Sequence, residues 1–584
     1  MNALLSHDHE LAVQASAGAG WPVRAWEIIL VLAAMTLLMY RPGFADGSFN
    51  HTETGLYLGN IQAIFQGKVP YRDIFLQFGP LNDYLPALFL KVFGPTIHSL
   101  RAFFFFSAIL TVLLGWVLAL KTLRARPFLY IAALVLVYEV FSPHWAAYWG
   151  GLRHAMGLLV LLALFGFLDS PRRRRWLFVS GLLGALALLT SIEVGLFACA
   201  ASALLVALHA WYHRLAWREF WGHLLALAGG WASVMLPFLA YYLAVGALKE
   251  YLRIAFYDVP FNHMAKFGQR KLITLGLGPS PASLWSWLFS ANFKMFLPFG
   301  VLAAGAFSCL RAWRARALEL RHFQMLALIL YGLPLFLVSF REFGGPQSQS
   351  GFTVPIVLGF MLLEGLYLQV RRAPGPGAGT RWTAPNLART LVLAYALVFL
   401  LASHNLVYGN LLGLLKTKQQ DYALLGRHQT GLVPLNLPGA GGVWLSPKEA
   451  AEVSGTVEYL QRYTRPGEPI IVVPEAGAYF FLANRPNLLR FSTPAMAYTA
   501  ERFQREILEQ LKRHPVRVIV KRNKTSGHAR HAGKPDYDLM PKFYDCINEF
   551  YRKKADIGPI SILVHRDMKL PEASPGSAGA AAPR

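Results

Sequence analysis

The stretch "ETGLYLGNIQAIFQGKVPYRDIFLQFGP" (Glu53–Pro80) lies between the first and second strongly apolar runs of the chain, where a short connector would be enough. Its first part has helical periodicity over residues 53–66, with an apolar face formed by Tyr57, Leu58, Ile61, Ile64 and Phe65. Thr52 is the expected N-cap and Gly67 the expected C′ residue. Glu53 is then in the first helical turn, where a carboxylate offsets the helix dipole and stabilises the helix by about 0.3–1 kcal/mol.

A second apolar segment, over residues 81–93, follows this stretch and ends at Gly94. Two such helices between two membrane spans are expected to lie half-buried at the outer membrane interface. The whole connection, residues 42–101, is therefore predicted to be a structured part of the molecule.

The composition indicates that lipid, rather than water, surrounds much of the surface. Of the 584 residues, 55% are hydrophobic and 15% are charged, whereas a soluble protein is about a quarter charged. About eleven runs are long and apolar enough to cross a bilayer. They lie near 26–41, 102–120, 128–142, 154–169, 176–191, 194–212, 223–245, 293–310, 323–340, 351–370 and 388–405. The expected fold class is a polytopic α-helical membrane protein.

The distribution of Lys and Arg predicts the orientation of these spans. Clusters such as "PRRRR" (171–175) and "RAWRARALELR" (311–321) occupy alternate connections, as cytoplasmic loops do. The N-terminus is then cytoplasmic, and an odd number of spans places the C-terminus outside. Because such loops account for the net charge of +24, nucleic acid is not expected as a partner.

The chain divides into four parts on this topology. Residues 1–25 form a cytoplasmic segment, 26–405 the membrane core, 406–570 a periplasmic domain and 571–584 a disordered tail rich in Pro, Gly and Ala. In the domain, helical patterns alternate with the strand patterns "PIIVVP" and "VRVIVK", which predicts a small α/β fold. Its first helix is expected to have Ser446 as N-cap.

The motifs of the opening loop resemble the GT-C superfamily, membrane glycosyltransferases that take sugars from polyprenyl-phosphate donors, and in particular its bacterial aminoarabinose and mannose transferases. In bacterial members this loop commonly reads Asp-Glu-Gly-x-Tyr, followed by Gly-x-x-Pro-Tyr-x-Asp. Here Glu53–Tyr57 reads Glu-Thr-Gly-Leu-Tyr, and Gly67–Asp73 reads Gly-Lys-Val-Pro-Tyr-Arg-Asp. The resemblance extends to the multi-span core, to Arg153 at the start of the fourth apolar run, and to the α/β domain, as far as about residue 567.

This resemblance implies an inverting transfer of a sugar from polyprenyl phosphate to a lipid, glycan or protein acceptor, at the periplasmic side of a bacterial inner membrane. It makes Glu53 the general base toward the acceptor hydroxyl and Asp73 a second catalytic carboxylate. The departing phosphate needs cations, for which the candidates are Lys68, Arg72, Arg153, His154 and Arg341. This chemistry requires neither a metal ion nor another cofactor, and no metal-ligand spacing occurs in the sequence.

Candidates for contact with the substrates are the aromatic and charged residues of the predicted outer side. They are Tyr57, Tyr71, Glu139, His144, His263 and Arg270. The two tyrosines belong to the motifs of the opening loop. Each of the others also has an ordinary interpretation, as an interfacial residue or as a residue at the end of a span that reaches water.

The sequence departs from the family pattern at its acidic positions. Glu53 stands where Asp is usual, Thr54 stands where a second acid is common, and the second outer loop, "SPHWAAYWGGLRH", has no acid. Two other hypotheses therefore stay open. One is a non-catalytic protein with the same fold. The other is a lipid or solute transporter, although inverted repeats and polar midplane residues are not visible.

Overall fold

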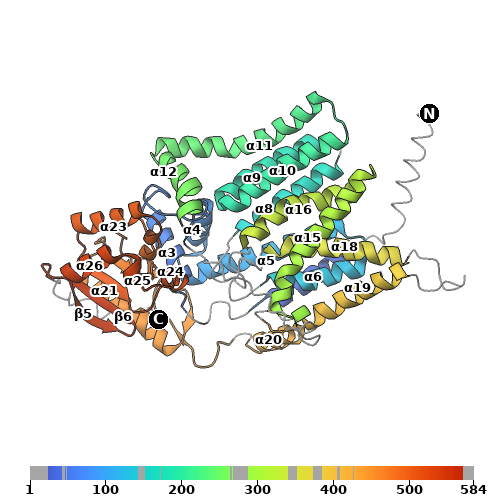
Figure 1. The fold of residues 1–584 in the computed structure, drawn as a ribbon. Helices are drawn as coiled ribbons and strands as arrows, with labels where there is room; N and C mark the ends of the chain where they lie inside the picture. Colours follow the sequence, from blue (N-terminus) through green and yellow to red (C-terminus); the bar gives the residue numbers. More distant parts are fainter. Residues whose placement is uncertain are drawn as a thin grey trace, which may run out of the picture.

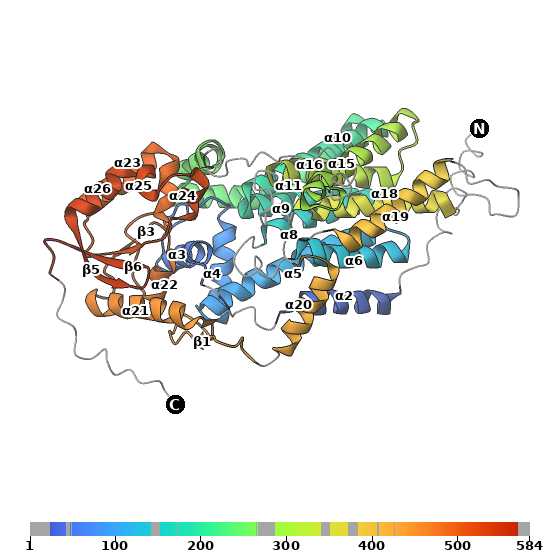
Figure 2. The same ribbon diagram turned by 60° about the horizontal axis from the view of Figure 1, so that its bottom comes forward.

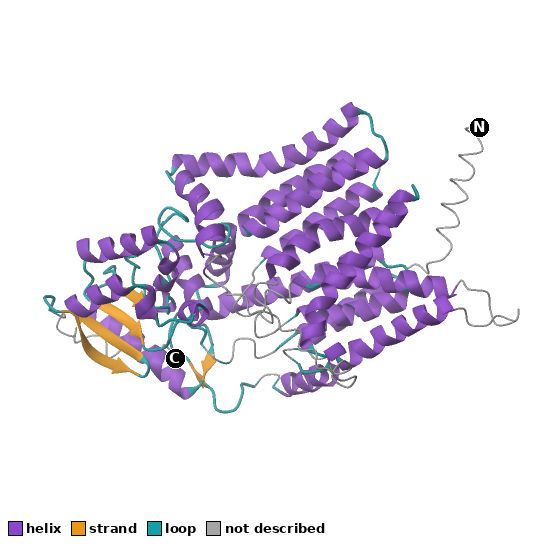
Figure 3. Cartoon of the chain, viewed as in Figure 1, coloured by secondary structure: helices purple, strands orange, loops and turns teal. Residues whose placement is uncertain are grey.

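The computed structural model describes residues 24–41, 47, 49–141, 152–170, 172–263, 266, 287–339, 351–371, 384–403, 405, 408–424 and 427–569. These residues form a helical bundle and, at one end of it, a C-terminal domain that contains all of the described strands (Figures 1 and 3). The segments predicted to be a cytoplasmic N-terminus and a disordered tail fall almost entirely outside the described residues.

Every apolar run expected from the sequence is helical in the structure. The bundle helices are α2 (Ala25–Met39), α5 (Ile97–Thr122), α6 (Arg126–Val140), α8 (Arg153–Asp169), α9 (Arg173–Thr190), α10 (Ile192–Tyr212), α11 (Trp217–Ala244), α15 (Ala291–Arg314), α16 (Leu320–Ser339), α18 (Thr353–Arg371) and α19 (Ala384–Ala402). Of the described helices, six are long and apolar enough to cross a membrane, namely α5, α10, α11, α15, α16 and α18. The chain is thus a helical multi-span membrane protein, and the count of eleven spans stays a prediction.

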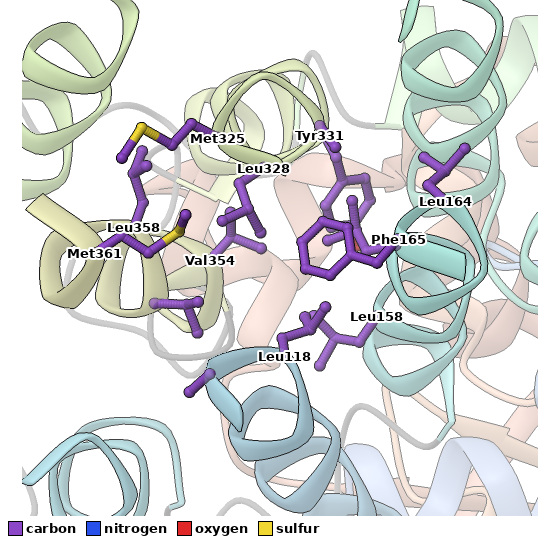
Figure 4. Close-up of a cluster of buried hydrophobic side chains, with 14 of the residues drawn as sticks. Leu118, Leu158, Leu164, Phe165, Met325, Leu328, Tyr331, Val354, Leu358 and Met361 are labelled. Atoms are coloured by element: carbon purple, nitrogen blue, oxygen red, sulfur yellow. The ribbon is translucent and has the colours of Figure 1, made fainter. Parts of the chain in front are cut away.

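The core of the bundle lies where α5, α8, α16 and α18 meet (Figure 4). Its buried side chains include Leu118, Leu158, Phe165, Leu328, Tyr331, Val354 and Leu358. In lipid, close approach of helices matters more than hydrophobicity, and small residues permit it. Gly157 of α8 has this role, because a Cβ at this position would lie only 1.9 Å from the Tyr331 hydroxyl oxygen.

The two helices predicted in the opening loop are present as α3 (Glu53–Phe65) and α4 (Leu81–Phe93). Thr52 is at the N-cap position of α3, as expected, but its side chain makes no capping hydrogen bond. Asn50 Oδ1 instead accepts the backbone N–H groups of Thr52 and of the next residue, at 3.1 and 2.9 Å. After the helix, Gly67 has a φ of +80°, a conformation that glycine adopts without steric cost.

The surroundings of α3 differ from the prediction of a half-buried interfacial helix. Residues Thr54 to Ala63 are all buried, because α3 lies between the bundle and the C-terminal domain (Figure 2). α4 fits the prediction better, since it exposes Leu88, Val92 and Phe93. Such an apolar face suits the membrane interface.

The C-terminal domain is built on a mixed four-stranded sheet. In spatial order its strands are β3 (Ile471–Val473), β4 (Val518–Arg522), β6 (Ile560–His565) and β5 (Tyr551–Ile557). β3 and β4 are parallel, whereas β6 is antiparallel to both of its neighbours. The predicted strands correspond to β3 and β4, and the β5–β6 hairpin was not predicted.

Helices cover both faces of this sheet (Figure 2). The helices α21 (Pro447–Tyr463) and α22 (Ala478–Leu482) lie on one face, and α23 (Glu501–Arg513) and α26 (Pro541–Phe550) lie on the other. Residues of β3 alternate accordingly: Val472 packs with the first pair, and the residues on either side of it pack with the second. Ser446 caps α21 as predicted, because its Oγ accepts the Glu449 N–H at 3.3 Å. The predicted α/β domain is therefore present.

α3 packs directly against the backbone of this domain. A Cβ on Gly55 would lie 2.9 Å from the Gly477 nitrogen, and a Cβ on Gly59 would lie 2.7 Å from the Ser492 Cβ. Only residues without a side chain allow so close an approach. α3 is therefore the element through which the domain is joined to the opening loop.

Replacing Gly55 by Val forces α3 away from the domain. We expect Gly55→Val to reduce the free energy of unfolding by about 1–3 kcal/mol, the usual cost of overpacking, and to make the junction sensitive to protease. Thermal unfolding and limited proteolysis of the purified chain measure these effects. Gly365→Val is the control, because an added Cβ at Gly365 meets no atom within 4 Å. Equal melting temperatures for the two variants would contradict the packing.

Candidate functional site

The residues just before Glu53 are held by the C-terminal domain. His51 Nε2 lies 3.3 Å from Glu452 Oε1, and both side chains are buried. Thr52 donates its hydroxyl to Glu475 Oε1 at 2.8 Å. Because these contacts fix the chain where α3 begins, the half-buried side chain of Glu53 extends from a rigid backbone.

Glu475 follows β3 and is itself buried in the domain. Its carboxylate accepts the Gly527 N–H at 3.0 Å and has the Arg522 Nη1 atom at 3.9 Å. Burial alone raises the pKa of this carboxyl, but hydrogen bonds from His528, Thr52 and Gly527 together bring the pKa below its ordinary value. Glu475 is therefore a charged acceptor that ties the start of α3 to the domain.

Ionisable groups from three helices influence the hydroxyl of Tyr57, which lies one turn along α3 from Glu53. Asp83 of α4, Arg153 of α8 and Glu53 itself all interact electrostatically with the Tyr57 hydroxyl, and burial raises the pKa of Tyr57. The Arg153 guanidinium carbon lies 4.3 Å from the centroid of the Phe78 ring. A carboxylate and a guanidinium are therefore within electrostatic range of the protonated Tyr57 hydroxyl, where α3, α4 and α8 come together.

Asp83, in the first turn of α4, is a buried carboxyl of this region that the sequence analysis missed. Its Oδ1 accepts from Asn60 Nδ2 at 2.8 Å, and Asn60 Oδ1 accepts from the Ser492 hydroxyl of the domain at 2.7 Å. The neighbouring Asn82 donates to the Tyr57 hydroxyl at 2.9 Å. Burial raises the pKa of Asp83 to about 7, although the Asn60 hydrogen bond favours the charged form.

The second motif forms a tight turn whose polar side chains are engaged by the protein. Asp73 accepts the Val69 N–H at 2.8 Å and pairs with Arg72, with 2.7 Å between Nη2 and Oδ2. Burial alone raises the pKa of Asp73, but the hydrogen bonds from Arg72 and Val69 bring it below its ordinary value. Lys68 donates to the Asn487 carbonyl oxygen at 2.7 Å. Through these contacts the turn is internally braced and attached to the domain.

Tyr71 supports this turn from the protein interior. It is fully buried and has a φ of +66°, which is uncommon for a residue other than glycine. Its ring packs against those of Tyr242 and Tyr251, and its hydroxyl donates to the Phe78 carbonyl oxygen at 2.5 Å. Tyr71 thus holds Phe78 in place, and the Phe78 ring in turn lies beneath Arg153.

The chain beyond α11 reaches the same region through η1 (Ile254–His263), a π-helix. π-Helical turns are frequent at functional sites. The ring of the fully buried His263 lies 6.3 Å from Phe75 and 6.0 Å from His528, measured between ring centroids. Asp258 of η1 also pairs with Arg502 of the domain. His263 is therefore placed between the opening loop and the domain.

The remaining predicted residues divide into three groups. His154 follows Arg153 in the first turn of α8. Glu139 lies near the end of α6 and pairs with Lys294 of α15, 2.5 Å away. His144, Arg270 and Arg341 lie outside the described residues. In the described part of the chain, no group of three His, Cys, Asp or Glu side chains could hold a metal ion.

Comparison with known proteins gives a match in fold. No protein-family model and no curated protein matches the chain. ArnT from Cupriavidus metallidurans in the apo state has a TM-score of 0.50 and 14% identity, over 92% of this chain and 97% of that chain. The same ArnT bound to undecaprenyl phosphate has a TM-score of 0.49 and 14% identity, over 93% and 98%. The apo oligosaccharyltransferase from Archaeoglobus fulgidus has a TM-score of 0.48 and 12% identity, over 91% and 73%.

The likeness to apo ArnT extends over nearly the whole of both chains. Because the sequence identity is low, this likeness concerns the fold. It agrees with the resemblance that the motifs of the opening loop indicate. The chain therefore has a GT-C-like fold, which it shares with ArnT.

Proposed function

We propose that this chain is an inverting glycosyltransferase, which moves a sugar from a polyprenyl-phosphate donor to a hydroxyl-bearing acceptor at the periplasmic face of a bacterial inner membrane. The observation that carries the proposal is the junction of bundle and domain, where Glu53, Asp83 and Arg153 all act electrostatically on the buried Tyr57 hydroxyl. The donor class is taken from ArnT, which shares the fold and has been solved with undecaprenyl phosphate. The acceptor is a lipid, a cell-envelope glycan or a protein.

In the proposed reaction, Glu53 takes the proton of the acceptor hydroxyl while the acceptor oxygen attacks the anomeric carbon. The bond between that oxygen and the anomeric carbon forms as the bond from the carbon to the phosphate oxygen breaks. Polyprenyl phosphate leaves with both electrons of the broken bond, and the anomeric configuration inverts. Glu53 suits this role because it is half-buried and its backbone is held by the domain.

Arg153 is the cation best placed to balance the charge of the departing phosphate. It lies at the same junction, and a guanidinium can donate two parallel hydrogen bonds to a phosphate. Lys68 and Arg72 already have partners in the protein, so we assign them to the support of the loop. His154 and Arg341 are retained as candidates for further phosphate contacts.

Asp73, predicted as a second catalytic carboxylate, is assigned a positioning role in this proposal. Its oxygens are engaged by the Val69 N–H and by Arg72. These bonds shape the turn that ends in the sequence from Phe75 to Phe78. Asp73 would then act on the reaction through Phe78 and Arg153.

Asp83 gives the site a second carboxyl, one whose charge changes near neutral pH. When it is protonated, Glu53 is the negative group next to Tyr57. When it ionises, a second negative charge appears in the same region and opposes an incoming phosphate. The rate of transfer should therefore depend on the state of Asp83.

A non-catalytic protein with the same fold is the second candidate, because Thr54 stands where a second acid is common. Thr54 is buried, and a carboxylate at this position would be costly. The packing of α3 against the domain thus explains why position 54 has Thr in place of a second acid. Position 53 still has a carboxylate. This observation favours the enzyme.

Glu53→Gln keeps the size of the side chain and removes its basicity. We expect it to lower transfer by about 10²–10⁴-fold, the usual contribution of a general base, at an unchanged melting temperature. The assay follows radiolabelled sugar from undecaprenyl-phosphate aminoarabinose or undecaprenyl-phosphate mannose into a bacterial envelope extract, with the purified full-length chain.

Glu53→Asp is the matched variant, because it restores the acid that is usual in the family, and it should retain more activity than Glu53→Gln. Asp556→Asn, at an exposed carboxylate of the β5–β6 hairpin, is the control and should leave transfer unchanged. Equal rates for wild type and Glu53→Gln would exclude Glu53 as the base. Inertness of the wild type with both donors would support the non-catalytic candidate.

Asp83→Asn keeps an acceptor for Asn60 but cannot ionise. Because the pKa of Asp83 in the folded chain is about 7, above its ordinary 3.8, ionisation of Asp83 opposes folding. This cost is absent below about pH 4, grows as the pH rises toward 7 and is complete above it. We therefore expect the wild type to lose stability relative to Asp83→Asn over this interval, by on the order of 4 kcal/mol.

The same variant should lose the inflection near neutral pH in the profile of transfer rate. Melting temperatures and initial rates of both proteins, measured across this pH range, check the two expectations. Profiles of wild type and variant that run parallel at every pH would contradict the assignment of Asp83.

A further inference from the structure

The bundle contains a cavity that the proposed reaction does not use. It has a volume of about 390 Å³ and lies between α6, α15, α18 and α19. Its lining is apolar apart from Glu139, Lys294 and the hydroxyl of Tyr395. Gly300 and Gly359 are part of the wall, so α15 and α18 leave room between them.

The polar residues mark one end of this cavity. Lys294 Nζ lies 2.5 Å from Glu139 Oε2 and 5.4 Å from the centroid of the Tyr138 ring. Asn405, which follows α19, donates to the same Glu139 oxygen at 3.3 Å. The ion pair is therefore at the end of the bundle from which the chain continues into the C-terminal domain (Figure 1).

From Lys294 the apolar lining continues along α15 to Ala304. Ten residues of helix correspond to about 15 Å, which is half of the roughly 30 Å hydrocarbon core of a bilayer. The cavity is thus about as long as one leaflet is thick. Its outer wall is α19, whose other side exposes Leu391 and Leu397, so the cavity lies only one helix away from the surrounding lipid.

We propose that this cavity binds one acyl chain of a phosphate-bearing membrane lipid, with the lipid phosphate on Lys294. Water finds too few hydrogen-bond partners in an apolar cavity, whereas a hydrocarbon chain fills such a cavity without loss of hydrogen bonds. Both side chains of this ion pair are largely buried, and ionisable residues enclosed in a membrane bundle are usually functional. The ammonium of Lys294 supplies the positive charge that would attract a lipid phosphate to this end of the cavity.

The length of the cavity favours an acyl chain, rather than a polyprenyl chain, as the occupant. The cavity is about one leaflet deep, which is the reach of one acyl chain, whereas a polyprenyl chain is longer than that. The site is also built from other helices than α3, α4 and α8, which carry Glu53, Asp83 and Arg153. The inference is therefore independent of the proposed sugar transfer.

Photolabelling of the full-length chain tests the site. The probe is a phosphatidylglycerol with a photoreactive group in one acyl chain, added to the purified chain in a maltoside detergent that has no phosphate. We expect the label on the lining segments of α15 and α18. Gly300→Phe should reduce labelling about tenfold, equivalent to about 1.4 kcal/mol, because a side chain added at Gly300 enters open space in the cavity wall.

Gly365→Phe is the matched control, because an added side chain there also meets open space but Gly365 does not line the cavity. It should label like the wild type. Lys294→Gln should weaken labelling by phosphatidylglycerol about tenfold and leave labelling by a photoreactive diacylglycerol, which has no phosphate, unchanged. Gln nearly keeps the length of the Lys side chain and can still donate to Glu139, so this variant also tests the site if Gly300→Phe does not fold.

Three results would overturn the proposal. One is equal labelling of wild type and of both Gly300→Phe and Lys294→Gln. Another is label confined to helices other than α6, α15, α18 and α19. The third is label that undecaprenyl phosphate displaces and unlabelled phosphatidylglycerol does not, which would assign the cavity to the sugar donor.

Discussion

The position of Glu53 depends on the seating of α3 against the C-terminal domain. The contacts that seat the helix come from Thr52, Gly55, Gly59 and Gln62, the last of which donates to a domain residue at 2.8 Å. These positions are three or four residues apart, so they lie on one face of the helix. The two glycines let the domain approach the helix backbone closely, and the Thr52 hydroxyl and the Gln62 amide both donate hydrogen bonds to the domain.

A second face of α3 presents the groups of the candidate site. Glu53, Tyr57 and Asn60 are also spaced by three or four residues, and they face Asp83 of α4 and Arg153 of α8. One helix therefore connects the domain on one side to the groups of the candidate site on the other. This arrangement explains why a membrane protein has an ordered α/β domain attached to its opening loop: the domain fixes the rotation of the helix that carries the carboxylate.

Local sequence pattern was sufficient for the helices, because a bilayer requires long apolar segments and helical periodicity identifies α3 and α4. The surroundings of these helices depend on distant residues and could not be predicted. Thr52 was expected to cap α3, yet it bonds a carboxylate 423 residues away. Lys68 likewise bonds a residue that is distant in sequence, because its ammonium donates to the carbonyl oxygen of Asn487. In the sequence Asp83 is only an acid in an apolar helix, because the residue that bonds it, Asn60, belongs to a different helix.

The roles proposed for Glu53 and Arg153 are tested most directly by an experimental structure of the full-length chain with undecaprenyl phosphate bound. We expect a phosphate oxygen about 2.7–2.9 Å from the Arg153 guanidinium, which is the distance of a charge-assisted hydrogen bond. We also expect the Glu53 carboxylate to point toward the bound phosphate. A phosphate bound away from Arg153, or a Glu53 side chain directed away from the phosphate, would contradict these roles.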